Sequence, residues 1–185
     1  MDKRALVARA GQGDHDAFAV LATAASARLD AAARLILRDP ELARDAVQNT
    51  LVRAWRDLPG LRDPDRFDAW LHRLLVNASL DEARRRRRRP IEVEIRTIDE
   101  PADADASRHL ADRDLVERAL VRLDPEHRAL VVLHYYLGYP LPEAATSLGI
   151  SLPAAKSRLH RAMEGLRRTM TVDASAVPLK GGRPA

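Results

Sequence analysis

The sequence predicts an all-α fold made of two small helical domains joined by a flexible linker. Apolar residues recur at the i, i+3, i+4, i+7 spacing of amphipathic helices in a first block up to residue 89 and in a second block from residue 110. Between the blocks, residues 90–109 lose this periodicity and are rich in Asp and Glu, which is typical of an extended linker. No segment carries a strand pattern over more than a few positions, so we expect no β-sheet. The expected organisation is a domain over residues 1–89, an acidic flexible linker over 90–109, a second domain over 110–170 and a mobile tail over 171–185.

Three helices are expected in the first domain. Asp14 is a candidate N-cap for a helix that ends near Asp39. A second helix covers residues 41–58 and is stopped by Pro59-Gly60, and Asp63-Pro64 begins a third. Their apolar stripes, which can close one core, contain Phe18, Leu21, Ala25, Leu29, Ile36, Val47, Leu51, Ala54, Trp55, Phe67, Trp70, Leu71, Leu74, Leu75 and Ala78.

The second domain is expected to hold four short helices. A first helix ends at Leu123, and Asp124-Pro125 begins another that Gly138 closes. Two more helices, over residues 141–148 and 152–166, are separated by a turn.

The charge balance, the absence of cysteine and the lack of long apolar runs limit the classes of protein to which the chain can belong. The 185 residues include 31 Lys plus Arg against 27 Asp plus Glu, for a net charge of +4 and a pI near 9.9. So small an excess of positive charge can attract a charged partner only where the basic residues are clustered. Cysteine is absent, no apolar run reaches the roughly 18 residues of a membrane span, and the N-terminus lacks a signal-peptide pattern, so we expect a cytoplasmic protein. The 6 histidines are scattered without metal-ligand spacing, and we expect no metal, no cofactor and no catalytic site.

The last two expected helices form a helix-turn-helix. Gly149 can adopt the left-handed backbone that ends the first helix, Ser151 can cap the second, and Pro153 is tolerated in its first turn. The solvent-facing side chains expected on the second helix are Lys156, Ser157, Arg158, His160 and Arg161. These groups suit phosphates and base edges, so the motif indicates DNA binding. The alternative is an ordinary amphipathic helix with a solvated basic face.

The helix over residues 41–58 carries uncharged amides on the face opposite the core. This outer face holds Asp45, Gln48, Asn49, Val52 and Arg56. Amides and a valine are easier to desolvate than Lys and Glu, which favours a protein interface. A neutral exposed face is the alternative.

The third helix continues directly into the arginine run of residues 84–89. Adjacent guanidinium groups repel one another unless a polyanion is near, which favours a nucleic-acid backbone as neighbour. The outward ridge expected on this helix consists of His72, Arg73, Asn77, Asp81 and Arg84. Asn77 could pair with the edge of an unstacked base, and His72 and Arg73 are the planes available for stacking. A solvated charge run is the alternative.

Taken together, these segments resemble the extracytoplasmic-function group of bacterial RNA polymerase sigma factors. DAVQNTLVRAW (residues 45–55) resembles region 2.2, DRFDAWLHRLLVNASLDEARR (residues 65–85) resembles regions 2.3 and 2.4, and residues 120–168 resemble region 4. The resemblance implies two helical domains that bind core RNA polymerase and direct transcription from promoters with minus-ten and minus-thirty-five elements. It also implies an anti-sigma protein as a partner, and a linker that runs toward the RNA exit path.

The resemblance assigns roles to residues at matching positions. Core polymerase would contact Asp45, Gln48, Asn49, Val52, Arg53 and Arg56. The minus-ten element would contact His72, Arg73, Asn77, Asp81, Arg84 and Arg85, and the minus-thirty-five element Ser151, Ala154, Lys156, Ser157, Arg158, His160 and Arg161. Departures from the family pattern are His72 for Tyr, Asn49 for Glu, Ala154-Ala155 for Thr-Val and Ala144 for Ile, so we expect a weak or atypical minus-thirty-five contact.

Two other classes of protein remain as alternatives. A stand-alone helix-turn-helix regulator would share the DNA-binding motif, but such proteins normally dimerise, and no dimer helix is evident. An adaptor whose arginines bind RNA or acidic proteins would explain the charge run.

Overall fold

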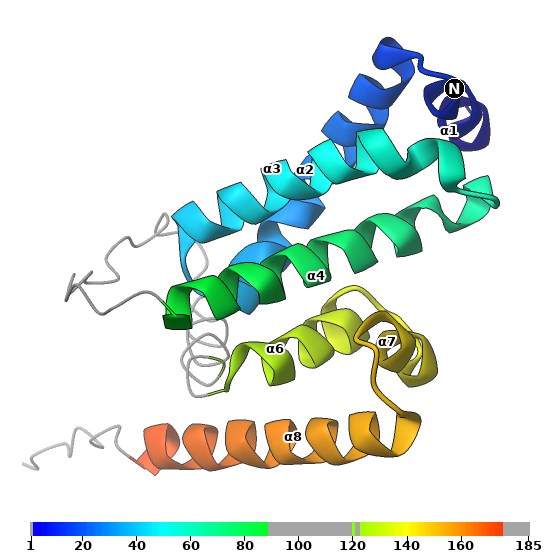
Figure 1. The fold of residues 1–185 in the computed structure, drawn as a ribbon. Coiled ribbons are helices and arrows are strands. Elements are labelled where there is room, and N and C mark those ends of the chain that lie inside the picture. Colours follow the sequence, from blue (N-terminus) through cyan, green and yellow to red (C-terminus); the bar gives the residue numbers. More distant parts are fainter. Residues whose placement is uncertain (1, 89–119, 121–122, 176–185) are drawn as a thin grey trace, which may run out of the picture.

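The computed structural model describes residues 2–88, Leu120 and residues 123–175, and every regular element in these ranges is helical (Figure 1). The N-terminal domain contains α1 (Lys3–Gly11), α2 (His15–Leu37), α3 (Pro40–Asp57), the 3-10 turns η1 (Leu58–Gly60) and η2 (Pro64–Arg66), and α4 (Phe67–Arg88). The C-terminal domain contains α6 (Pro125–Val131), the π-helical segment η3 (Val132–Tyr136), α7 (Leu141–Ser147) and α8 (Leu152–Ser175). The expected linker over residues 90–109 and the helix expected before Leu123 lie outside the described residues, apart from Leu120.

Aspartate caps set the starts of α2, α3 and α6, and those at Asp14 and Asp124 are the ones that the sequence predicts. The Asp14 carboxylate accepts a hydrogen bond of 3.0 Å from the backbone N–H of Ala17, and Asp39 accepts bonds from the first turn of α3. Asp124 accepts a bond of 3.0 Å from the backbone N–H of His127, at the start of α6. These caps satisfy N–H groups that have no partner within the helix, so each domain's helices begin at defined residues.

Two helices differ in extent from the expectation. Helix α1 was not predicted, yet its Leu6, Val7 and Ala10 are buried. It has only one apolar stripe over two turns, which is too short a pattern to identify from sequence alone. Helix α8 continues to Ser175, beyond Thr171, where we expected a mobile tail to begin.

The core of the N-terminal domain forms where α2, α3 and α4 pack together. The predicted positions Leu29, Ile36 and Leu75 are wholly inaccessible to solvent. Trp55 closes the core near α1, where its ring stacks on His15 with centroids 4.3 Å apart and meets the edge of Phe18. Burial of these stripes explains the three-helix arrangement predicted from periodicity.

Helix α4 is apolar on a second side, and this side packs against the C-terminal domain. Val76, Leu80 and Ala83 are buried on α4 although they lie off the predicted stripe. In Figure 1, α6 lies between α4 and α8, and contacts join α6 to α2 and α4 as well as to α8. The buried residues of the two domains therefore form one continuous apolar cluster. The sequence predicted two domains but not that they close on each other.

Within the described residues, no helix combines the length and apolar character needed to cross a membrane.

Candidate functional site

The outer face of α3 is open to solvent. Asp45, Gln48, Asn49 and Arg56 are exposed, and the Val52 residue is 62% exposed, which makes it the most exposed large apolar residue in the described part of the chain. Arg53 is half-buried, with its guanidinium 4.0 Å from the Asp81 carboxylate of α4. A solvent-exposed valine among amides costs little to desolvate, so this face is suited to docking another protein.

The turn between α7 and α8 has the geometry that a helix-turn-helix requires. Gly149 has a φ of 66°, in the left-handed region that glycine adopts without strain, and the backbone N–H of Ala154 donates to the Ser151 hydroxyl over 3.4 Å. Ala155 and Ala162 are buried, which fixes the rotation of α8. Lys156, Ser157, His160 and Arg161 are consequently exposed together on α8, as predicted.

Arg158 does not point to solvent as expected. Its guanidinium turns toward α6 and lies 2.9 Å from the Glu126 carboxylate. Position 158 lies at the border of the buried stripe of α8, so its long side chain reaches the neighbouring helix more easily than the outer face. This part of our prediction for the recognition helix is wrong for the closed arrangement of the domains.

The arginine run is partly neutralised by nearby carboxylates. Arg84 pairs with Asp81 on its own helix at 3.4 Å and with Glu126 of the C-terminal domain at 3.6 Å. Arg85 lies 3.1 Å from the carboxylate of Glu82, and Arg86 3.0 Å from that of Asp39. The remaining ridge residues, Arg73 and Asn77, are exposed and partly exposed respectively. Residue 89, the last of the run, lies outside the described residues.

His72 corrects a second expectation, because it is buried rather than outward. It is 6% exposed, and its Nδ1 shares a hydrogen bond of 2.7 Å with the Tyr139 hydroxyl of the C-terminal domain. Burial, assisted by the nearby positive charge of Arg28, lowers the pKa of His72 to about 4. His72 shares the α4 side that holds Val76 and Leu80, and the C-terminal domain covers this side. The ring is therefore neutral at pH 7 and is not available for stacking in this arrangement.

Two arginines join the domains by hydrogen bonds to backbone carbonyls at helix C-termini. Arg128 of α6 is 8% exposed, and its Nε donates to the Ile36 carbonyl in the last turn of α2 over 2.6 Å. In the other direction, Arg28 of α2 donates to the Leu137 carbonyl, which follows η3, over 3.3 Å. Carbonyls at helix C-termini lack partners within the helix and carry partial negative charge, so both contacts are favourable. Burial lowers the pKa of Arg128 to about 10, which leaves it charged at neutral pH.

The comparisons with known proteins identify the family. Residues 21–89 match the model of sigma-70 region 2, and residues 113–166 match that of sigma-70 region 4. The ECF RNA polymerase sigma factor SigL of Mycobacterium tuberculosis is 37% identical over 71% of this chain and 76% of its own length. The chain belongs to the extracytoplasmic-function sigma factors of the sigma-70 family. As a sigma factor of RNA polymerase, it directs promoter-specific transcription, and sigma factors in general are not enzymes.

Two solved structures share the architecture of this sigma factor. CnrH, solved in complex with the cytosolic domain of CnrY, is 33% identical, with a TM-score of 0.64 over 94% of this chain and 99% of CnrH. RpoE of Bartonella quintana, solved with the anti-sigma factor NepR, is 27% identical, with a TM-score of 0.64 over 79% of this chain and 91% of RpoE.

Sequence reasoning missed the residues that close this sigma factor, namely Glu126, Arg128 and Tyr139. Each looks like an ordinary surface residue when only its own segment of the sequence is considered. The available signal was on α4, where Val76 and Leu80 make the helix apolar on more than one side. A helix that is apolar on two sides has neighbours on both.

Proposed function

We propose that this sigma factor docks on core RNA polymerase through the outer face of α3. The contact residues are Asp45, Gln48, Asn49, Val52, Arg53 and Arg56. The observation that carries this proposal is the exposure of Val52, 62%, on a face that the closed C-terminal domain leaves uncovered. A partner that buries this apolar side chain gains binding free energy, because the groups around Val52 cost little to desolvate.

Promoter recognition is divided between the two domains in this proposal. The region 2-like domain (1–89) reads the minus-ten element through Arg73, Asn77, Asp81, Arg84, Arg85 and His72, and the region 4-like domain (110–170) reads the minus-thirty-five element through α8. Unstacking duplex DNA costs a few kcal/mol per step, and base and phosphate contacts offset this cost. The chain itself supplies binding free energy, the polymerase supplies the chemistry, and both act in the cytoplasm.

An anti-sigma factor is a further expected partner. CnrH was solved with the cytosolic domain of CnrY, and RpoE was solved with the anti-sigma factor NepR. This sigma factor has the same two-domain architecture, so we propose that a protein of that class binds it. Competition between the candidate protein and core polymerase in a pull-down assay tests this partner.

Run-off transcription with purified core polymerase, followed by mapping of the start sites, tests the function. We expect initiation at defined sequences only when the chain is added. A stand-alone regulator would instead shift duplex promoter DNA in a gel without polymerase and would not support initiation.

Substituting Val52 by Asp should weaken binding to core polymerase at least about tenfold, because a carboxylate would be desolvated in the interface. Stability should hardly change, since Val52 is 62% exposed. Fluorescence anisotropy with labelled chain measures the affinity. Val20→Asp is the matched control, because Val20 is also an exposed valine, 45%, but lies on α2. Equal weakening by both variants would contradict the assignment of the α3 face.

Substituting Asn77 by Ala should slow promoter opening about tenfold, because one base-edge contact of roughly 1–3 kcal/mol is lost. Polymerase affinity should stay unchanged, since α3 is untouched. Permanganate reactivity of unpaired thymines measures the opening. Gln12→Ala, which removes an exposed amide beyond the end of α1, is the control. A loss of polymerase binding by Asn77→Ala would show that its role is misassigned.

A further inference from the structure

A cavity of about 410 Å³ lies where the end of α2, the start of α3, the end of α4 and the start of α6 come together. Small-molecule sites usually have volumes of about 300–1,000 Å³, so this cavity can hold a small ligand. Its lining residues come from both domains, and none of them belongs to the polymerase or DNA contacts proposed above. The proposed function therefore gives the cavity no role.

Part of the cavity lining is apolar. Leu37 at the end of α2 and Ala83 of α4 are buried, and Leu42 in the first turn of α3 is partly buried. Leu123 and Pro125 add to this apolar lining from the C-terminal domain. Water is displaced from such a surface with a gain in free energy when an apolar group of a ligand covers it.

The charged part of the lining is mostly basic, with Arg86 and Arg87 of α4 and Arg128 of α6. Arg86 pairs with the Asp39 carboxylate at 3.0 Å, whereas no described carboxylate lies within ion-pairing distance of Arg87 or Arg128. Arg128 is 8% exposed and donates from Nε and Nη1 to backbone carbonyls. Its Nη2 has no acceptor among the described residues, so it can donate to a ligand.

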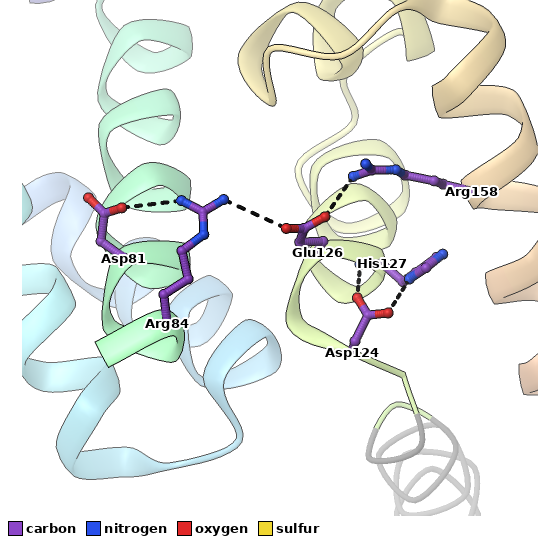
Figure 2. Close-up of polar contacts among 6 residues, drawn as sticks. All are labelled: Asp81, Arg84, Asp124, Glu126, His127 and Arg158. Carbon is purple, nitrogen blue, oxygen red and sulfur yellow. Dashed lines mark hydrogen bonds and ion pairs between the residues drawn. The ribbon is translucent and has the colours of Figure 1, made fainter. Parts of the chain in front are cut away.

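One carboxylate also lines the cavity, that of Asp124, but the first turn of α6 already occupies it. It accepts a bond of 3.0 Å from the His127 backbone N–H and contacts the His127 ring at 2.6 Å (Figure 2). Burial, with repulsion from Arg38 and Arg87, lowers the pKa of Arg128 to about 10. The charge of Asp124 opposes this shift without cancelling it. An anion in the cavity would relieve the repulsion among the arginines.

The chemistry of the lining favours an anion with an apolar part. The planar fork of an arginine donates two parallel N–H bonds to a phosphate or a carboxylate. A phosphate monoester carries a charge of about −1.5 to −2 at pH 7, so it can neutralise two arginines at once, which a carboxylate cannot. Inorganic phosphate would leave the apolar lining in contact with water, and nucleic acid carries only a single charge on each phosphate.

We propose that this cavity binds a small phosphate monoester with an apolar substituent. The phosphate lies between Arg87 and Arg128, and the substituent covers the leucines of α2 and α3. The site goes beyond the proposed function, since it uses none of the proposed contact residues and its tests need no polymerase. Because the lining comes from both domains, the ligand contacts both of them at once.

Titration of the full chain with hexyl phosphate, followed by phosphorus NMR, tests the site. We expect saturable binding with a dissociation constant below about 1 mM. Methyl phosphate has the same charged group without the chain, so it should bind at least about tenfold more weakly. A larger dissociation constant for hexyl phosphate, an absence of saturation, or equal affinity for the two esters overturns the proposal.

Removal of one positive charge tests the phosphate contact. Arg87→Gln should weaken the binding of hexyl phosphate at least about fivefold, because one charge-assisted pair is lost. Arg88→Gln is the matched control, since Arg88 is the next exposed arginine of α4 but does not line the cavity. It should change the affinity at most about twofold. Equal weakening by both variants would mean that only the net charge of the arginine run matters, and the proposal would be rejected.

The ratio of the two ester affinities tests the apolar contact. Leu42→Ala should reduce this ratio about threefold, because it removes methyl groups that the hexyl chain covers. Leu51→Ala is the matched control, since Leu51 is also partly buried on α3 but does not line the cavity. A partial loss of folded protein affects both esters equally and does not change the ratio. If Leu42→Ala leaves the ratio unchanged, the hexyl chain does not lie on the apolar lining and the proposal fails.

Nucleic acid is the other phosphate compound that the arginine run could bind. A duplex of about 20 base pairs would contact the exposed arginines of the whole run, so Arg87→Gln and Arg88→Gln should weaken its binding to a similar extent. Hexyl phosphate should instead distinguish the two variants. If the duplex and hexyl phosphate respond alike to them, the arginines bind a nucleic-acid backbone and the cavity is not a separate site.

Discussion

Replacing Arg128 with Ala will separate the two domains of the free sigma factor. The substitution removes the donor to the Ile36 carbonyl and leaves a cavity where the buried side chain lay. A buried carbonyl without a partner costs about 1–3 kcal/mol, and the cavity adds to this cost. Desolvation of the guanidinium, which also lowers its pKa to about 10, opposes closure and returns part of the loss. The net expectation is about 2 kcal/mol, a shift of roughly thirtyfold toward the open arrangement.

A fluorophore pair attached at Ala8→Cys on α1 and Thr146→Cys on α7, two exposed positions in a chain without cysteine, measures this shift directly. Arg28→Ala is the matched control, because Arg28 makes the opposite contact, to the Leu137 carbonyl at 3.3 Å, from a more exposed position. Its effect should stay below about 1 kcal/mol. Far-ultraviolet circular dichroism distinguishes opening from unfolding, since the opened chain keeps its helices. If Arg128→Ala leaves the distance unchanged, Arg128 does not hold the domains together.

The helices were predictable because their signals are local. Asp14 and Asp124 each cap the next helix through a side-chain bond to a nearby backbone N–H, and such a cap can be recognised from a few consecutive residues. Gly149 was predictable for the same reason, since its positive φ is imposed by the turn that it makes. The outer face of α3 followed from helical periodicity alone.

The orientation of His72 and Arg158 was not predictable in this way. Both lie at the border between a buried stripe and the outer face, where periodicity does not decide the direction of a long or planar side chain. Their partners are distant in sequence: Tyr139 lies in the connection between η3 and α7, and Glu126 lies on α6. The second apolar side of α4 signals that a neighbour packs there, but a single sequence does not say which residues of that neighbour meet His72 and Arg158, so these pairings had to come from the structure.

Acidification will open the sigma factor through His72. The ring has a pKa of about 4 when closed, chiefly because of burial, with Arg28 and Lys3 lowering it and Asp68 raising it. Separation of the domains removes Tyr139 and returns His72 to water, where an imidazole has a pKa near 6.5. A depressed pKa means that the closed state binds fewer protons, so closure is fully stable above about pH 6.5 and weakens as the pH falls toward 4.

The free energy that favours the closed arrangement should fall by about 2 kcal/mol at pH 5. The distance between the two fluorophores should show this loss as a growing open population. The variant His72→Asn cannot titrate but keeps a side chain that can bond the Tyr139 hydroxyl, so it should remove this pH dependence. If the variant opens over the same pH range, His72 is not the group responsible.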